Sequence, residues 1–237
     1  GGGSASRSAA PASPCASACM SLALPPAPSA PPHAGSSILG CPTSAPGFSR
    51  SPLEAVGGNT TSTTYYDNVR VPRDAIIGEV DGGWKLLTSQ LNHERVGLAA
   101  MSGRTEALWE IVRDWCVEAG IASEPWVQSD LARAYAQVEA MKLLNWQLTA
   151  SVDSNDVKVA DASAAKVFGT ETHAAVCRTL FNLLGSAGAR RGLDGVAAGR
   201  VETLTRGAIV NTFGGGVNEV MRDLIAVAGL GMPRGNR

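Results

Sequence analysis

The chain has 237 residues and a net charge of −1, with 44% hydrophobic and 17% charged residues. This length fits one large domain or two small ones. The near-zero charge provides no basic field for nucleic acid, and no stretch approaches 18 uninterrupted apolar residues, so we expect neither nucleic-acid binding nor a membrane span. Five irregularly spaced cysteines without a C-x-x-C pair favour free thiols in a reducing cytoplasm over a disulfide framework or a metal site.

The composition changes sharply near residue 50. Of the first 50 residues, 37 are Ala, Ser, Pro or Gly, and only Arg7 and Arg50 are charged. Such a segment buries too little apolar surface to offset the entropy of ordering, so residues 1–45 are predicted to be disordered. The segment has the pattern of neither a secretory signal nor a transit peptide. Its bias also fits a misread frame of GC-rich DNA.

Residues 46–80 combine strand formers with turn signals. The stretch 60–72 (TTSTTYYDNVRVP) is rich in Thr, Tyr and Val, and Gly57-Gly58 precedes it. It predicts one or two strands with a turn at Asp67-Asn68. We therefore expect a short β-hairpin in this region.

From Trp84 onward, apolar residues recur at spacings of three, four and seven, which is typical of amphipathic helices. Gly120 is expected to end the first of these helices. Long helices joined by short loops are typical of antiparallel neighbours, so residues 81–234 are predicted to form an up-down four-helix bundle, and the fold to be mainly α. The predicted helices span about 83–118, 126–151, 156–184, 196–212 and 218–230.

Two adjacent charges, Glu94 and Arg95, fall on the apolar stripe of the first helix. On a helical wheel both lie close to Leu91 and Leu98, on the face that should pack against the core. Burying charge is costly unless the charge is paired or used. A structural ion pair or a wetter groove explains the pattern, and so does a carboxylate whose burial favours proton abstraction, with Arg95 positioning the helix or a neighbouring loop.

Glycine-rich segments near the C-terminus are the other candidates. Gly214-Gly215-Gly216 precedes the last helix, where free N–H groups suit an anionic or polar ligand, although a flexible loop explains it equally. Gly185 and Gly188 could let a cofactor approach the backbone, or could simply cap a helix and form a turn. No strand precedes them, so they are not a dinucleotide fingerprint. The histidines are scattered, and His93 is expected to face solvent.

Three stretches together resemble one family, in consistent order over about residues 46–234. YYDNVRVPRDAIIGEVDGGWKLLTSQLNHERVGLAA (65–100) is similar to the junction between the β-domain and the C-terminal helical domain of acyl-CoA dehydrogenases. NLLGSAG (182–188) resembles that family's Q-x-x-G-G-x-G flavin segment. FGGGVNEVMRDLIAVAGLGMPR (213–234) resembles its terminal Y-E-G-T-N-E-I-Q-R…LGLPR signature.

The resemblance implies a fold and an activity. The family has an α-helical N-terminal domain, a middle β-domain and a C-terminal four-helix bundle, binds FAD and assembles as a tetramer. It implies α,β-dehydrogenation of an acyl-CoA thioester in fatty-acid or sterol side-chain catabolism. A carboxylate removes the α-proton, the β-hydride passes to the flavin, and electron-transferring flavoprotein reoxidises the flavin.

Site residues follow from the resemblance position by position. The commonest base, a Glu before Gly-Thr in the terminal signature, has no counterpart, because Gly215 stands there. Isovaleryl- and long-chain-type members carry the base on the Glu-Arg helix, at the position of Glu94. Arg95 matches a buried supporting arginine, and Asn92 matches a residue that contacts the thioester arm of the substrate.

Two segments match flavin contacts of the family. Asn182, Gly185 and Gly188 match residues that touch the flavin of the neighbouring subunit. In the terminal segment, Gly216, Val217 and Glu219 are the expected cofactor contacts, although Val217 replaces a Thr that donates a hydrogen bond to the flavin.

Other family features are missing. AGIASEPW (119–126) stands where the pyrophosphate-binding R-x-x-F-G is expected, and nothing matches the N-terminal domain or most of the β-domain. Members acting on sterol side chains can be heteromeric, with flavin contacts split between subunits. We therefore expect a homo- or hetero-tetramer, and a chain that is truncated, inactive or very weak alone and prone to associate. The alternative is a non-catalytic helical assembly subunit that completes a partner's active site.

Overall fold

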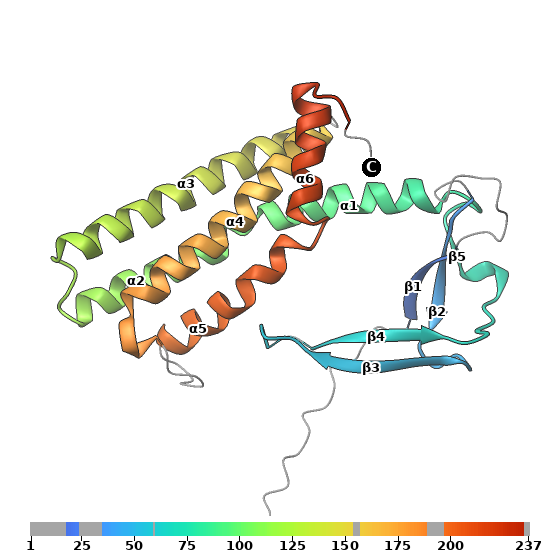
Figure 1. Cartoon of the computed structure of the whole chain (residues 1–237), viewed down its shortest axis with the longest axis horizontal. Coiled ribbons are helices and arrows are strands. Elements are labelled where there is room, and N and C mark those ends of the chain that lie inside the picture. The colour runs from blue at the N-terminus through green and yellow to red at the C-terminus, as the bar shows by residue number, and fades with distance from the viewer. Residues whose placement is uncertain (1–17, 24–34, 59, 154–156, 189–196, 235–237) are drawn as a thin grey trace, which may run out of the picture. The chain divides into compact units, whose positions relative to one another are not determined.

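The computed structural model describes residues 18–23, 35–58, 60–153, 157–188 and 197–234 (Figure 1). The chain divides into two compact units. The first comprises Gly1–Leu53 and Thr61–Thr88 and contains small sheets, whereas the second comprises Glu54–Thr60 and Ser89–Arg237 and is helical. Helix α1 (Gly83–Ala99) begins in the first unit and ends in the second.

A three-stranded sheet in the first unit has the order β1-β2-β5, from Ala18–Ala23, Ser37–Pro42 and Ile76–Ile77. Its strands pair antiparallel. The prediction of disorder is therefore wrong for β1 and β2. Composition misleads here because backbone pairing does not depend on charged or bulky side chains, and β2 also supplies Ile38 and Cys41, which are buried.

A second sheet consists of β3 (Phe48–Glu54) and β4 (Thr60–Tyr66), so a hairpin is present, but Asp67-Asn68 follows β4 and does not join its two strands. At its open end the N–H of Asp67 donates to the carbonyl of Gly47 at 2.9 Å. The rings of Phe48 and Tyr66 meet edge to face there, with centroids 5.4 Å apart. The predicted turn follows immediately, with Asn68 at a φ of +51°.

The second unit is a helical bundle centred on α4 (Figure 1). Helix α4 packs against α2, α3, α5 and α6, which confirms the prediction of a mainly α fold. Short 3₁₀ turns follow α4 and α5, and a π-helical turn follows α6. The bounds are α2 Ser102–Glu118, α3 Pro125–Asp153, α4 Val159–Leu183, 3₁₀ Gly185–Ala187, α5 Ala197–Gly207, 3₁₀ Ala208–Thr212, α6 Asn218–Leu224 and π Ile225–Gly229.

The predicted single helix over 83–118 is wrong, because the structure contains two helices with a break at Ala100-Met101. At the break the N–H of Ala100 donates to Gly97 three residues earlier, at 3.2 Å, and α2 then starts anew. The apolar spacing continues in phase across the break, so periodicity does not reveal it. The predicted end at Gly120 is confirmed: its φ is +72°, and the N–H of Ile121 donates to the carbonyl of Cys116.

None of the described helices combines the length and apolarity needed to cross a lipid bilayer.

The main core lies between α2, α3, α4 and α5. The core is built from side chains spaced three or four residues apart on each helix, as an apolar stripe requires. They include Leu108, Val112 and Cys116 of α2, Val127 and Leu131 of α3, Val176, Leu180 and Leu183 of α4, and Val201 of α5.

We expect Leu180→Ala to lower the free energy of unfolding of the chain by about 2–5 kcal/mol, because Leu180 is fully buried and its truncation leaves a cavity. Leu143→Ala is the matched control, since the Leu143 side chain is 61% exposed and its loss should change stability by no more than about 0.5 kcal/mol. Urea unfolding followed by circular dichroism measures both. Equal losses in the two variants would contradict this assignment of the core.

Candidate functional site

The site predicted on α1 forms around the backbone of Gly215. The N–H of Gly215 donates to Oε1 of Glu94 at 2.9 Å, and Nε of Arg95 donates to the carbonyl of Gly215 at 2.9 Å. Arg95 is only 8% exposed, and Glu94 is half-buried. Both charged side chains thus reach the same peptide segment, on the bundle-facing side that the helical wheel predicts.

Burial is the main influence on Arg95. It lowers the pKa of the guanidinium, and the charge of the neighbouring Glu94 opposes this effect. A guanidinium still remains protonated at neutral pH. Arg95 therefore holds a positive charge close to the carboxylate of Glu94 in a poorly solvated place, where a charge acts more strongly than in water.

Gly214 and Gly215 of the loop pack closely against α1. A Cβ on Gly214 or on Gly215 would lie 3.2 Å from Cδ1 of Leu98, and one on Gly215 also 3.3 Å from Cγ of Arg95. Gly215 has a φ of +65°, which disfavours other residues. The expectation of free N–H groups in this loop does not hold for Gly215, because Glu94 already accepts its hydrogen bond.

A buried lysine on α4, which was not among the predicted site residues, holds the same loop from another side. Lys166 has no exposed surface, and its Nζ donates to the carbonyls of Thr212 at 2.9 Å and Gly216 at 2.8 Å. It also donates to Oδ1 of Asn218 at 2.6 Å. The sequence signal was a polar stripe of Lys166, Thr170, His173 and Cys177 among the small residues of α4.

An ion pair extends this network to the start of α6. Nδ2 of Asn218 donates to Oε1 of Glu171 at 3.0 Å, and Nη2 of Arg222 donates to Oε2 of Glu171 at 2.7 Å. The hydrogen bond from Arg222 is the main cause of a lowered pKa of Glu171, ahead of the opposing effect of burial. The carboxylate of Glu171 thus stays charged and links α4 to α6.

The expected cofactor-binding residues do not all gather at this point. Asn182 is exposed, and Gly185 has a φ of +52° with open space where a Cβ would lie. Sixteen residues of helical chain separate Asn182 from Lys166, about 24 Å along the axis of α4. The 182–188 segment therefore lies at the opposite end of α4 from the glycine loop.

The remaining predicted positions lie in the loop, at the start of α6, after α4 and on α1. Val217 is half-buried and caps α6 without a side-chain hydrogen bond, and Glu219 is exposed in the first turn of that helix. Gly216 has a φ of +107°, and Gly188 packs closely on Leu184, where a Cβ would meet Cβ of Leu184 at 3.1 Å. Asn92 belongs to α1, but its side chain lies outside the described part of the structure.

His173 forms a separate buried cluster between α2 and α4. The hydroxyl of Thr105 donates to the carbonyl of Met101, so the 2.8 Å contact between Thr105 Oγ1 and His173 Nδ1 has the imidazole as donor. Burial, and then the charge of Arg104, lower the pKa of His173, and burial raises the pKa of Cys177 to about 12. Both groups are therefore neutral. His93 is exposed, as predicted.

We expect His173 to make the chain less stable as the pH falls from about 7 to 5. Its pKa is depressed in the folded state, so below about 6.5 the unfolded chain binds more protons and stability is lost, by at most about 1.4 kcal/mol per pH unit. His173→Gln should reduce this loss, whereas His93→Gln, at an exposed imidazole, should not. Urea unfolding at three pH values measures it, and equal slopes in all three proteins would contradict it.

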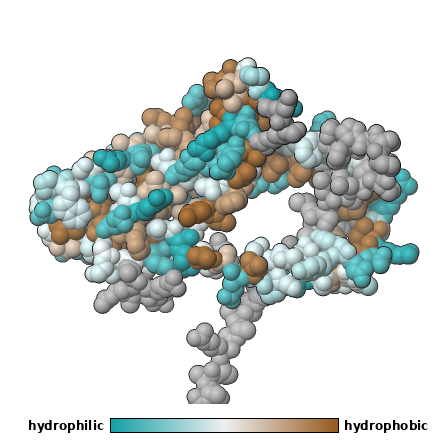
Figure 2. Space-filling model, viewed as in Figure 1, coloured by the Kyte–Doolittle hydropathy of each residue, from teal (hydrophilic) through white to brown (hydrophobic). Residues whose placement is uncertain are grey.

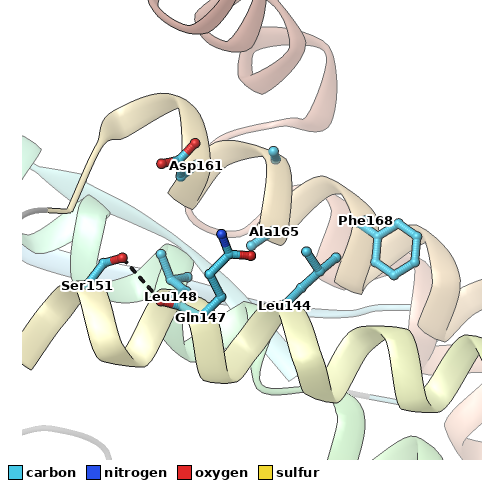
Figure 3. Close-up of a pocket in the computed structure, with 8 residues that line it drawn as sticks. Leu144, Gln147, Leu148, Ser151, Asp161, Ala165 and Phe168 are labelled. Carbon is cyan, nitrogen blue, oxygen red and sulfur yellow. Dashed lines mark hydrogen bonds between the residues drawn. The ribbon is translucent and has the colours of Figure 1, made fainter.

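A pocket of about 310 Å³ lies between α3 and α4 (Figure 3). Leu144, Leu148 and Phe168 supply much of its apolar lining. Gln147 and Asp161 contribute polar groups to the lining. None of the predicted site residues lines it. No group of three or more His, Cys, Asp or Glu among the described residues could hold a metal ion. The glycine loop is the candidate site because Glu94 and Arg95, both predicted site residues, meet there at Gly215.

Comparison with known proteins identifies the family. The family model of the acyl-CoA dehydrogenase C-terminal domain matches residues 81–230. The chain belongs to the acyl-CoA dehydrogenase family. Acyl-CoA dehydrogenase FadE26 of Mycobacterium tuberculosis is 45% identical over 216 residues, which cover 86% of this chain and 54% of FadE26. FadE29 of the same species is 40% identical over 214 residues, which cover 87% of this chain and 54% of FadE29.

Solved acyl-CoA dehydrogenase structures share the fold. The structure described as Tcur3481-Tcur3483 steroid ACAD is 53% identical, with a TM-score of 0.84 over 92% of this chain and 56% of that chain. The ChsE4-ChsE5 complex from Mycobacterium tuberculosis is 41% identical, with a TM-score of 0.82 over 92% of this chain and 58% of that chain. The chain thus spans about half the length of the relatives it matches.

Proposed function

We propose that this chain carries the catalytic base of an FAD-dependent acyl-CoA dehydrogenase, and that Glu94 is that base. The observation that carries the proposal is the carboxylate of Glu94, half-buried on α1 and anchored by the N–H of Gly215 at 2.9 Å beside the buried Arg95. General-base catalysis requires a carboxylate fixed in direction and partly shielded from water. With Oε1 engaged by Gly215, Oε2 is the oxygen that receives the α-proton.

The cofactor we propose is FAD. When bound, FAD supplies the acceptor for the β-hydride. Asn182 and Gly185 offer an exposed amide and an unobstructed stretch of backbone, which fit a polar part of the cofactor. Gly216 and Glu219 would contact it near the other end of α4, whereas Val217 has no side-chain donor. Because the two groups lie at opposite ends of α4, they fit contacts to different copies of the cofactor, each shared with another subunit.

We also propose that this chain assembles with partner subunits. Large apolar side chains remain exposed on the helical unit, among them Trp146 at 64% and Phe213 at 65% exposure, and Figure 2 shows apolar residues across its surface. Such side chains favour burial against other subunits. Two similar structures are described by names that pair two proteins, which supports a hetero-tetramer over a homo-tetramer. Electron-transferring flavoprotein is the proposed electron acceptor.

The substrate class we propose is the CoA thioester of a steroid side chain. The support is the similarity to the structure described as a steroid ACAD, at 53% identity. A straight-chain fatty acyl-CoA is the competing substrate.

The test is anaerobic titration of the complex that copurifies with the tagged full chain. We expect loss of the oxidised flavin absorbance, and a 2-enoyl-CoA product by mass spectrometry, with a steroid side-chain thioester but at least about tenfold less efficiently with octanoyl-CoA. A complex without flavin, or with flavin that no acyl-CoA reduces, would contradict the proposed function. Preference for octanoyl-CoA would overturn the substrate class alone.

The alternative is a non-catalytic assembly subunit that completes a partner's site. Val217, which lacks a hydrogen-bond donor at an expected flavin contact, favours it. Under this alternative the complex is active, but its activity is independent of Glu94.

A further inference from the structure

Lys166 is the most unusual buried group in the helical unit. Lys166 is the largest fully buried side chain of the described residues. Lysine is rarely buried unless its charge is compensated. An ammonium group has three hydrogens to donate, and here three acceptors meet it at 2.6–2.9 Å. All three acceptors belong to residues 212–218, so the full hydrogen-bonding capacity of this side chain is directed at the glycine loop.

The loop has little of its own to fix its shape. Gly214, Gly215 and Gly216 have no side chains, and two of them adopt positive φ values of +65° and +107°. Glycine has more conformational freedom to lose than any other residue. The geometry of this loop must therefore be imposed from outside, by Arg95 on the carbonyl of Gly215 and by Lys166 on the carbonyl of Gly216.

The two contacts act on neighbouring peptide groups. The carbonyl of Gly215 belongs to the peptide that joins Gly215 to Gly216, and Lys166 holds the next carbonyl along the chain. Lys166 holds the carbonyls of Thr212 and Gly216. Gly215, whose N–H donates to Glu94, lies between these two residues in the chain. Loss of Lys166 would remove the contacts at Thr212 and Gly216 and leave Arg95 as the remaining one of the two side chains that hold the loop.

We infer that Lys166 is a positioning residue for Glu94: it locks the 212–218 loop so that the N–H of Gly215 directs the carboxylate. This inference rests on the proposed role of Glu94 as the base. Lys166 has no exposed surface and does not contact the substrate; it acts only through the loop. Asn218 supports it, because one end of its amide accepts from Lys166 and the other donates to Glu171.

The experiment compares Lys166→Met with Lys142→Met in the full chain and in its complex. Lys142 is the matched control, since its ion pairs with Glu106 and Glu139 join α2 and α3 rather than the loop. Hydrogen exchange by mass spectrometry should be at least about tenfold faster in a peptide covering 212–218 for Lys166→Met only. Core peptides of α3 should be unchanged in both variants.

Kinetics separate a positioning role from general weakening of the fold. In Lys166→Met we expect kcat to fall at least about tenfold while KM stays within about threefold. The isotope effect with an α-deuterated substrate should rise, because a misdirected base slows proton removal. Loop exchange and kcat both within twofold of wild type would overturn the inference. Faster exchange with an unchanged kcat and isotope effect would overturn the positioning role and leave only a structural contact.

A second variant decides the matter if Lys166→Met does not fold. Asn218→Ala removes one acceptor but retains Lys166, and we expect at least about threefold faster exchange in 212–218 with a lower kcat. Unchanged exchange and kcat in a folded Asn218→Ala would overturn the inference. Failure of the proposed function looks different, since activity would then survive the loss of the Glu94 carboxylate, whereas the exchange measurement requires no activity.

Discussion

Glu94→Gln should reduce turnover of the assembled enzyme by about 10³-fold, with KM for the acyl-CoA changed by less than about fivefold. A positioned general base contributes about 10²–10⁴-fold, and an amide cannot accept the α-proton. The amide oxygen of Gln can still accept the hydrogen bond that the N–H of Gly215 donates to Glu94 at 2.9 Å. The substitution therefore removes basicity while retaining the anchor, and steady-state kinetics measures the loss.

Exchange of the substrate's α-proton with D₂O distinguishes a missing base from a damaged assembly. We expect Glu94→Gln to lose this exchange together with flavin reduction, and Glu110→Gln, an exposed carboxyl on α2, to retain both. A Glu94→Gln complex with wild-type turnover and exchange would contradict the catalytic role and favour the assembly subunit. Wild-type exchange without turnover would place the base elsewhere.

Local patterns predicted most of the helical unit. Apolar spacing located the helices, and Gly120 marked the end of α2, because both signals arise from neighbours within a few turns. The break at Ala100-Met101 left no such signal, since the apolar phase continues through it. The strands β1 and β2 escaped prediction for a different reason: their pairing joins segments that have few of the residues typical of strands.

The candidate site divides in the same way. Glu94 and Arg95 could be found because charge on an apolar stripe is visible within one helix. Lys166 could not be assigned, because its three acceptors lie 46 to 52 residues further along the chain. The sequence shows the lysine on the small-residue face of α4, but it does not show which groups accept its hydrogen bonds. Which loop it holds depends on tertiary packing that spacing does not encode.

Arg95→Met should lower the free energy of unfolding by about 2–3 kcal/mol and turnover by at least about tenfold. Arg95 is 8% exposed, and its Nε donates to the carbonyl of Gly215 at 2.9 Å. A hydrogen bond from a charged group contributes about 1.5–3 kcal/mol, and its removal leaves a buried carbonyl unpaired. Since Gly215 also donates through its N–H to Glu94, loss of the carbonyl contact loosens the base as well.

Two further substitutions show whether the effect of Arg95→Met comes from the buried hydrogen bond of Arg95 or from its positive charge alone. Arg113 is half-exposed, pairs with Asp114 and lies over the Trp109 ring, so Arg113→Met should cost no more than about 1 kcal/mol and leave turnover unchanged. Arg95→Lys keeps the positive charge but lacks the Nε that reaches Gly215, so we expect it to recover stability only in part. Urea unfolding and kcat, measured on all three variants, decide this. Full recovery by lysine would mean that the charge near Glu94, rather than the hydrogen bond to the loop, is what the site requires.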